Sequence, residues 1–242
     1  RNFNYRNNLI VSANLINECI TYGTKIIFTS SMAVYGDQTP PFTEDKRPQP
    51  IDPYGIAKYA VECDLKLAHE QFGLRYNIVR PHNVLGVYQN IWDRYRNVIG
   101  IFIRKALNGQ PILVYGDGEQ TRAFSDIKYY MEPFDKLLTG HDGETFNIGA
   151  DKHFSLNEVA ITVQTIAAKY GYHVNIEHGE PRHEVKHAFC DHTKAKTLLN
   201  FEDNTNLADL IESVFVWAMK QPNRKVKDME YEVTKDIYEY WK

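Results

Sequence analysis

Apolar side chains in the first part of the chain repeat at helical spacing and then give way to a short continuous apolar run. The repeat covers residues 5–22 and predicts a helix. The apolar positions on one face of that helix are Leu9, Ala13, Ile16 and Ile20. Gly23 ends the pattern, and the β-branched run 25–30 that follows predicts a buried strand.

A second helix and a second strand follow a loop that is rich in proline. Residues 54–72 have helical spacing, and the apolar run 76–79 predicts another buried strand. Strand, long loop, helix and strand in this order are typical of a parallel α/β sheet. Further along, the pattern predicts a helix over 95–108 and strands at 112–115 and 145–148.

The last part of the chain continues the mixture of helices and strands. Ser155 and Glu158 have the spacing of a capping box, which predicts the start of a helix that continues to about Tyr170. The chain as a whole is therefore expected to be an α/β protein.

Composition and charge narrow the possible classes. The 242 residues are 43% hydrophobic and 24% charged, and the net charge of −3 comes without a basic block, so we expect no nucleic-acid partner. No apolar run approaches the ~20 residues of a membrane span, so we expect no membrane partner. Cys19, Cys63 and Cys190 have no CxxC spacing and no signal pattern follows Arg1, which predicts reduced thiols in a cytoplasmic protein.

Tyr54 and Lys58 are the sharpest candidates for chemistry. They are four residues apart in a predicted helix, so their side chains lie on one face, a turn apart. A lysine ammonium in that place favours the phenolate and lowers the pKa of the tyrosine from its usual value of ~10. Helices carry such pairs by chance, so the pair gains its meaning from its neighbourhood.

That neighbourhood contains a hydroxyl at the end of a predicted strand. Ser31 follows the run 25–30 directly, and active sites of open α/β sheets lie at the carboxyl ends of strands. A hydroxyl there can hydrogen-bond the same substrate oxygen as a tyrosine on the next helix. Ser31, Tyr54 and Lys58 are therefore the candidate catalytic group.

Three segments together resemble the extended short-chain dehydrogenase family. They are S-S-x-A-V-Y-G at 30–36, P-Y-G-x-x-K at 53–58 and R-x-x-N-x-x-G at 80–86. The combination is most similar to the UDP-glucose (UDP-galactose) 4-epimerases of that family. The resemblance implies NAD as cofactor and epimerisation of a nucleotide sugar at C4 through a transient 4-keto intermediate. It also implies a homodimer, formed through the helices 5–22 and 54–72.

The resemblance also implies roles for single residues. Tyr54 would remove the proton of the sugar 4-hydroxyl, Lys58 would assist its ionisation, and Ser31 would hydrogen-bond the same oxygen. The implied contacts with NAD are made by Asn8, Tyr54, Lys58 and His82. The implied contacts with the sugar nucleotide are made by Ser31, Asn83, Asn97, Arg122 and Arg182. Two arginines suit a diphosphate because guanidinium groups pair bidentately with phosphate oxygens.

The first segment of the family has no counterpart in this sequence. Members begin with a strand, G-x-x-G-x-x-G and a helix, which hold the NAD pyrophosphate. The resemblance therefore implies a partial Rossmann domain, a doubly wound parallel sheet that lacks its first strands, at 1–85 and 122–150. A smaller α/β substrate domain is expected at 86–121 and 151–242.

Met32 and Ala33 bear on the reaction type. Dehydratases and decarboxylases of the family carry an acid in this region, because elimination and decarboxylation need further proton transfer. Met32 and Ala33 carry no proton, which favours epimerisation. The alternatives are a dehydratase, an epimerase of another nucleotide sugar such as a UDP-uronate or UDP-N-acetylhexosamine, and an inactive fragment that binds sugar nucleotide without NAD.

One motif points to a different chemistry. Residues 183–187 match H-E-x-x-H, the zinc-protease signature, and five histidines lie between His173 and His192. That signature needs a helix, so that both histidines face one metal ion. Pro181 precedes it closely and the residues after Glu184 have an extended pattern. We therefore expect no metal site.

Overall fold

The computed structural model describes residues 2–93, 97–182, 185–224, 232–233 and 235. The chain begins with one continuous helical run made of α1 (Asn2–Asn4), the π-helical η1 (Tyr5–Ile10) and α2 (Val11–Tyr22). Gly23 ends this run in the left-handed conformation, with a φ of 63°. The predicted first helix is therefore confirmed, although it starts earlier, at Asn2.

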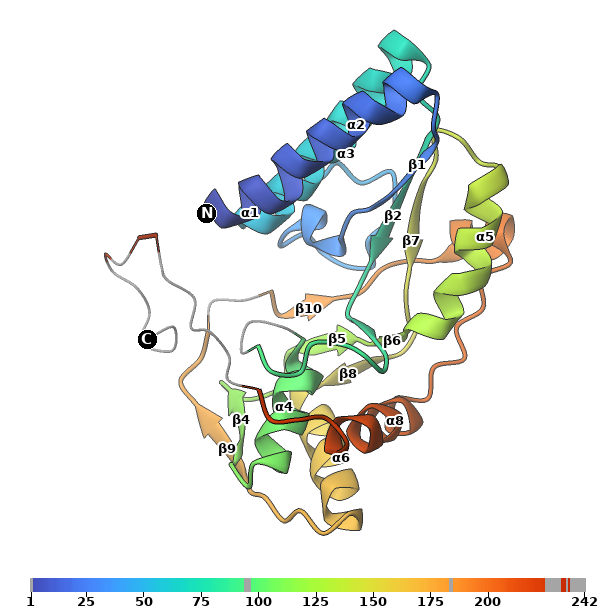
Figure 1. The fold of residues 1–242 in the computed structure, drawn as a ribbon. Coiled ribbons are helices and arrows are strands. Elements are labelled where there is room, and N and C mark those ends of the chain that lie inside the picture. Colours follow the sequence, from blue (N-terminus) through green and yellow to red (C-terminus); the bar gives the residue numbers. More distant parts are fainter. Residues whose placement is uncertain (1, 94–96, 183–184, 225–231, 234, 236–242) are drawn as a thin grey trace.

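Three parallel strands form the main sheet, in the order β1–β2–β7 (Figure 1). They are β1 (Ile26–Thr29), β2 (Tyr76–Pro81) and β7 (Thr145–Ile148), and all three lie where apolar runs predicted strands. The helix α3 (Pro53–Phe72) connects β1 to β2. Because the strands are parallel, their carboxyl ends lie at one edge of the sheet.

Helices cover both faces of this sheet (Figure 1). Ile78 and Val79 are neighbours on β2 and enter different cores, because successive side chains of a strand point to opposite faces. The core on the Ile78 side includes Ile16 of α2 and Leu65 of α3. The core on the Val79 side includes residues of α5 (Met131–Thr139) and α7 (Thr193–Leu199). This arrangement is the expected doubly wound sheet.

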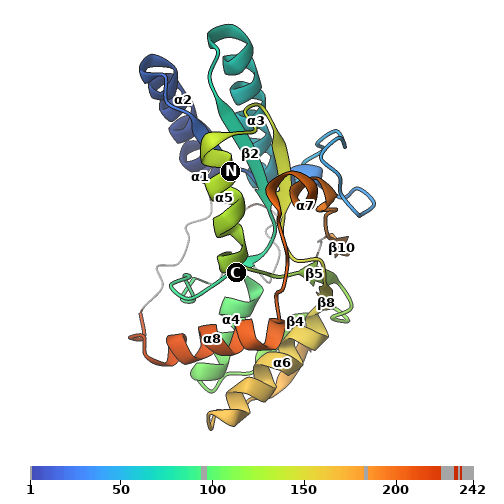
Figure 2. The ribbon, with the colours of Figure 1, turned by 90° about the vertical axis from the view of Figure 1, so that its right-hand side faces the viewer.

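A second core lies apart from this sheet, in the lower part of Figure 2. It is built by α4 (Val98–Leu107), α6 (Leu156–Lys169) and α8 (Leu207–Met219), packed against the strand pair β4 (Ile112–Tyr115) and β9 (Ile176–Gly179). The predicted capping box at the start of α6 is present. Ser155 Oγ accepts a hydrogen bond from Glu158 N at 3.2 Å, and Glu158 Oε2 accepts one from Ser155 N at 2.7 Å.

Several shorter elements complete the described fold. They are η2 (Met32–Tyr35), β3 (Val84–Leu85), β5 (Thr121–Ala123), β6 (Ser125–Asp126), η3 (Ile127–Tyr130), β8 (His153–Ser155) and β10 (His187–Ala188). Ala195 and Leu199 of α7 pack with Phe146 of β7. The α7 segment therefore packs with the main sheet, and the expected division of the chain into two domains stays a prediction.

Within the described ranges, no helix combines the length and the apolar character that crossing a bilayer requires.

Candidate active site

A cavity of about 270 Å³ lies at the carboxyl ends of β1 and β2. It brings together Ser31, Tyr54, Lys58 and Asn83, which come from three separate segments of the chain. The complete lining is Thr29, Ser30, Ser31, Tyr54, Lys58, Pro81, Asn83 and Val84. Four of the residues proposed from the sequence are therefore neighbours in space, at the edge of the sheet where open α/β proteins bind ligands.

The start of α3 sets the position of Tyr54. Asp52 caps the helix, because its carboxylate accepts a hydrogen bond from Gly55 N at 2.8 Å. Gly55 allows the first turn to lie directly against η2, since a Cβ atom at this position would be 2.6 Å from the carbonyl oxygen of Ala33. This close approach brings Tyr54 beside the turn that begins at Ser31.

Lys58 is held between the helix and the sheet. Its Nζ donates a hydrogen bond to the carbonyl oxygen of Thr29 at 2.8 Å and lies 5.8 Å from the centroid of the Tyr54 ring. Burial lowers the pKa of Lys58, because desolvation disfavours its charged form. The spacing of the two residues thus brings the Lys58 amine near the Tyr54 ring, and the expected effect of a positive charge there on the pKa of Tyr54 stays a prediction.

Ser31 and Asn83 are held by local hydrogen bonds. Ser31 Oγ accepts from Ala33 N at 3.2 Å, and its hydroxyl proton can still be donated to a substrate oxygen. Asn83 has a φ of 40° and its Nδ2 donates to the carbonyl oxygen of Ala123 at 2.9 Å. Asparagine is one of the few residues that tolerates this left-handed conformation.

His82 lies in the interior, next to the cavity. Its side chain is 1% exposed and lies away from the cavity, with Nε2 2.9 Å from Nε2 of His192. Burial, followed by the neighbouring His192, lowers the pKa of His82 to about 3. The imidazole thus points into the interior from a position next to the cavity, and the expected contact of His82 with NAD stays a prediction.

Asn8 and Asn97 also lie outside this cavity. Asn8 Nδ2 donates to the carbonyl oxygen of Asn4 within the first helix at 3.0 Å. Asn97 begins α4, where its Oδ1 accepts from Ile99 N at 3.1 Å. The structure gives Asn97 the role of a helix cap, and it leaves the expected ligand contacts of both residues untested.

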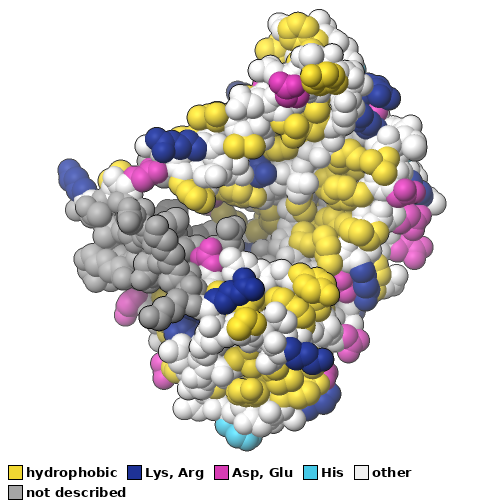
Figure 3. Space-filling model, in the orientation of Figure 1, with side chains coloured by type: hydrophobic (Ala, Val, Ile, Leu, Met, Phe, Trp, Pro, Cys, Tyr) yellow, Lys and Arg dark blue, Asp and Glu magenta, His cyan; other side chains and the backbone are white. Residues whose placement is uncertain are grey.

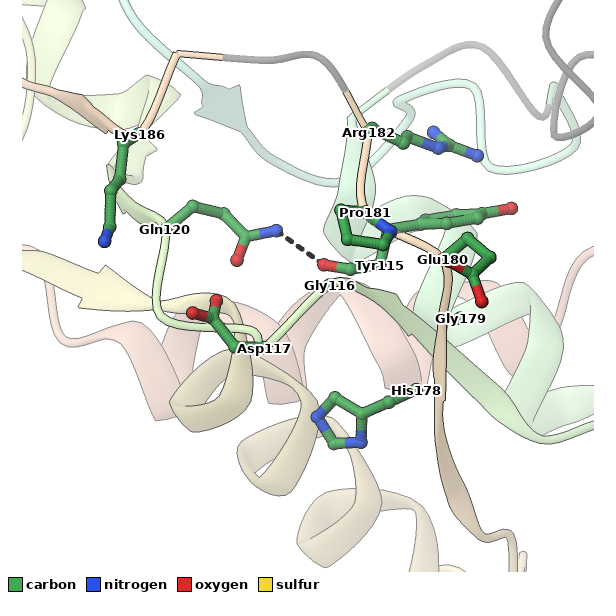
Figure 4. A pocket seen from close by; sticks show the side chains of 10 residues that line it. All are labelled: Tyr115, Gly116, Asp117, Gln120, His178, Gly179, Glu180, Pro181, Arg182 and Lys186. Carbon is green, nitrogen blue, oxygen red and sulfur yellow. Dashed lines mark hydrogen bonds between the residues drawn. The ribbon is translucent and has the colours of Figure 1, made fainter.

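A second cavity, of about 730 Å³, lies at the ends of β4 and β9 (Figure 4). Arg182 is in this cavity, and its guanidinium carbon lies 3.3 Å from the centroid of the Tyr115 ring. The remaining lining residues are Gly116, Asp117, Gln120, His178, Gly179, Glu180, Pro181 and Lys186. The sequence reasoning missed Tyr115, Gln120 and Lys186, although the G-D-G turn after the strand 112–115 marked the place.

Arg122 is beside this second cavity and does not line it. Its Nη1 donates to the carbonyl oxygens of Thr121 at 2.8 Å and of Lys186 at 3.1 Å. Lys186 is a lining residue, so Arg122 and Arg182 border the same stretch of chain. The expected joint grip of the two arginines on one diphosphate stays a prediction.

The H-E-x-x-H segment is only partly described. His183 and Glu184 lie outside the described residues, and the segment continues into β10, an extended strand at His187–Ala188. Among the residues that the structure does describe, no group of three or more His, Cys, Asp or Glu side chains is arranged to hold a metal ion.

A protein-family model matches the part of the chain that contains the first cavity. The model of the NAD dependent epimerase/dehydratase family matches residues 2–149, which is more than half of the chain. The chain belongs to this family. The match includes Ser31, Tyr54, Lys58 and Asn83, so the first cavity lies within the residues that the family model matches.

Individual members of the epimerase/dehydratase family resemble the chain along most of its length. A putative UDP-glucose 4-epimerase of Methanocaldococcus jannaschii is 34% identical over 83% of this chain, which spans 64% of that relative. A UDP-N-acetyl-alpha-D-glucosaminuronate decarboxylase of Bacillus cytotoxicus is 32% identical over 87% of this chain and 68% of the relative. The chain thus spans about two thirds of the length of these relatives.

Solved structures of epimerases have the same fold. The UDP-glucose 4-epimerase of Thermotoga maritima with UDP-glucose superposes with a TM-score of 0.80 and is 31% identical, over 87% of this chain and 69% of that one. The UDP-glucuronic acid 4-epimerase of Bacillus cereus with UDP-glucuronic acid and NAD has a TM-score of 0.78 and 26% identity, over 87% and 66%.

The residues of the first cavity fit one end of NAD. The Tyr54 hydroxyl and the Lys58 ammonium offer hydrogen-bond donors at the carboxyl edge of a parallel sheet. A volume of about 270 Å³ is at the low end for a ligand pocket, which suits a single nucleoside-sized group and not a whole dinucleotide. Tyr54 and Lys58 are the residues that would hold that group.

Proposed function

We propose that this protein is an NAD-dependent epimerase that acts at C4 of a UDP-hexose. The observation that carries the proposal is the single cavity in which Ser31, Tyr54 and Lys58 meet at the carboxyl edge of the sheet. Membership of the epimerase/dehydratase family supports it, and so do relatives named as UDP-glucose 4-epimerases. The proposal extends to UDP-galactose as the product of UDP-glucose.

The chemistry follows from the positions of three side chains. Tyr54 takes the proton of the C4 hydroxyl, and the Lys58 ammonium favours the phenolate that this step requires. Ser31 hydrogen-bonds the same oxygen and keeps it aligned. NAD, when bound, supplies the acceptor and donor of the hydride. After the keto sugar has turned, hydride would return to the opposite face of C4 and Tyr54 would return the proton to the oxygen, so the C4 configuration is inverted.

The lining of the first cavity supports epimerisation over decarboxylation. None of the described residues that line it is Asp or Glu, so no carboxyl group there can transfer a further proton. The decarboxylase relative nevertheless makes the dehydratase and decarboxylase class the second candidate, and UDP-uronates or UDP-N-acetylhexosamines alternative substrates.

The second cavity suits the UDP part of the substrate. Arg182 and Lys186 are the positive groups of its lining, which also contains Asp117 and Glu180, and the Tyr115 ring supplies an aromatic wall. Guanidinium and ammonium groups bind phosphate oxygens by charge-assisted hydrogen bonds. We infer that Arg182 binds the diphosphate of the sugar nucleotide.

Turnover and UDP binding, measured separately, test the proposal. With NAD present, the protein is expected to convert UDP-glucose to UDP-galactose, and titration calorimetry is expected to detect UDP. Arg182→Ala should weaken UDP binding about tenfold or more, because a charged hydrogen bond is lost. Arg75→Ala is the control, since this exposed arginine directly precedes β2 and does not line the second cavity. A wild-type protein that binds UDP without turnover would support a binding protein. A wild-type protein with neither UDP binding nor turnover would overturn the proposal.

We also propose that the protein is a homodimer through α2 and α3, which lie side by side in Figures 1 and 2. Both helices carry exposed apolar side chains at spacings of four and seven residues, which places them on one face of each helix. On α2 these positions include Val11, Leu15 and Tyr22, and on α3 they include Ile56, Cys63 and Leu67. Figure 3 has hydrophobic side chains over this part of the surface.

A charge in this apolar face is expected to separate the dimer. Leu15→Glu should convert a dimer into a monomer in analytical ultracentrifugation at micromolar concentration, because Leu15 is 52% exposed and central to the stripe. Asn17→Glu adds the same charge to an exposed position on another side of the helix and should leave the dimer intact. A wild-type protein that sediments as a monomer contradicts this proposal.

The cysteines support a cytoplasmic location. Cys19, Cys63 and Cys190 are all free thiols. Two of them are buried and packed as small apolar side chains, which suits a reducing compartment.

A further inference from the structure

A chain of buried polar groups lies directly behind the first cavity. Its centre is the ion pair of Glu62 and Arg80, whose exposed fractions are 0% and 1%. Arg80 Nε donates to Glu62 Oε1 at 2.9 Å, and Arg80 Nη2 donates to Glu62 Oε2 at 2.6 Å. Such a bidentate pair has a defined geometry, because the planar guanidinium matches the two carboxylate oxygens.

Two hydroxyl groups extend this pair in opposite directions. Ser30 Oγ donates to Glu62 Oε1 at 2.5 Å. On the other side, Arg80 Nη1 donates to the Tyr35 hydroxyl at 2.8 Å, which in turn donates to Asn147 Oδ1 at 2.8 Å. Burial raises the pKa of Tyr35, so this hydroxyl keeps its proton and can fill both roles.

The members of this chain adjoin the candidate catalytic residues in sequence. Glu62 follows Lys58 by four residues on α3, as Lys58 follows Tyr54, so the three lie on one helix face. Ser30 precedes Ser31, and Tyr35 ends the turn η2 that Ser31 begins. The network thus connects the face of α3 that carries Tyr54 to both ends of the segment that contains Ser31.

Stability alone does not account for a charged pair in this place. Replacing a buried ion pair by well-packed apolar residues is often neutral or stabilising, since desolvation costs about as much as the pair returns. What apolar residues lack is direction: they hold no hydroxyl group at a defined distance. The ion pair adds directed hydrogen bonds, because Glu62 accepts one from Ser30 and Arg80 donates one to Tyr35.

We propose that the Glu62–Arg80 pair is a positioning device that holds the Ser31 turn in register with Tyr54 and Lys58. Glu62 fixes the residue before Ser31, and Arg80 fixes the tyrosine that closes the turn. The proposal rests on the function proposed above for the cavity. Glu62, Arg80 and Tyr35 are positioning residues, because none of them lines the cavity.

The double variant E62L/R80M tests the proposal without leaving a buried charge unpaired. Its unfolding midpoint is expected to stay near that of the wild type, whereas kcat falls about 10- to 100-fold, as small misplacements of reacting groups do. KM and the affinity for UDP should change little, because Arg182, the proposed diphosphate-binding residue, lines the second cavity. A double variant that folds and keeps wild-type kcat overturns the proposal.

Tyr35→Phe and Tyr130→Phe form a matched pair in case the double variant does not fold. Both tyrosines are buried, and the Tyr130 hydroxyl donates to the carbonyl oxygen of Ile148 at 2.8 Å, outside this network. Tyr35→Phe should lower kcat about tenfold, while Tyr130→Phe should leave kcat unchanged. Equal kcat in the two variants contradicts the proposal.

A readout that does not depend on turnover separates this proposal from the proposed function. The titration of Tyr54 can be followed by NMR of ring-labelled tyrosine, assigned with Tyr54→Phe. In E62L/R80M and Tyr35→Phe its midpoint is expected to rise by about half a unit or more, because the Thr29 carbonyl that holds the Lys58 ammonium near the phenol directly precedes the Ser30–Tyr35 segment that the network fixes. If the wild type has no epimerase turnover but the Tyr54 midpoint rises in the variants, only the proposed function is contradicted. An unchanged midpoint in both variants contradicts the positioning role.

Discussion

Tyr54→Phe is expected to lower kcat for epimerisation by about 10²- to 10⁴-fold, the usual contribution of a positioned general base. The substitution removes the hydroxyl that takes the C4 proton and leaves the ring in place. Tyr54 is 37% exposed, so the free energy of unfolding should change by less than about 0.5 kcal/mol. The measurement is the rate of UDP-galactose formation from UDP-glucose with saturating NAD.

Tyr59→Phe is the control for this substitution. Tyr59 lies on the same helix and does not line the first cavity, so the loss of its hydroxyl should leave kcat within about twofold. UDP affinity should be the same in both variants, because the second cavity contains neither residue. A Tyr54→Phe protein that keeps more than half of the wild-type turnover would remove Tyr54 from the mechanism.

Gly149→Ala is expected to cost about 1–3 kcal/mol of stability or more, in the range of overpacked cores. A Cβ atom at this position would overlap the ring of His82. That ring cannot move aside easily, because it is 1% exposed and stacked on His192 at 5.0 Å between ring centroids. Chemical denaturation at pH 7 measures the change in the free energy of unfolding.

Gly140→Ala provides the matched comparison. A Cβ atom at 140 would lie 3.8 Å from its nearest neighbour, the carbonyl oxygen of Lys136, so this variant should stay within about 0.5 kcal/mol of the wild type. Adding His82→Ala to Gly149→Ala should recover part of the lost stability, since it removes the overlapping ring. If the two glycine variants are equally stable, the stacked histidines do not restrict this site.

Sequence patterns were most reliable where one physical signal dominated. The buried strands at 25–30, 76–79 and 145–148 were predicted from short β-branched runs between turn residues, and all three form the main sheet. The capping box at Ser155 needed only two residues at a fixed spacing. Spacing also predicted that Tyr54 and Lys58 share a helix face, because both belong to one element.

The roles of isolated polar residues depend more on distant partners. Asn97 and His82 were given ligand contacts through the family resemblance, and these contacts stay predictions. The structure adds that Asn97 caps α4 and that His82 is buried against His192. His192 is far away in sequence, and no local pattern indicates that the two imidazoles meet. The same reason explains why Glu62 and Arg80 were missed, since a Glu on a helix and an Arg on a strand usually lie at the surface.

The sequence by itself determined the class of fold, the order of the strands along the chain and the presence of Ser31, Tyr54 and Lys58, because these depend on short-range periodicity and on motifs within single segments. Only the tertiary structure decided which side chains meet. It placed Asn83 in the cavity, put α7 with the main sheet and closed the Glu62–Arg80 pair behind Ser31. These contacts join residues on different strands and helices, and their distances depend on how the sheet and its helices pack, which no local pattern encodes.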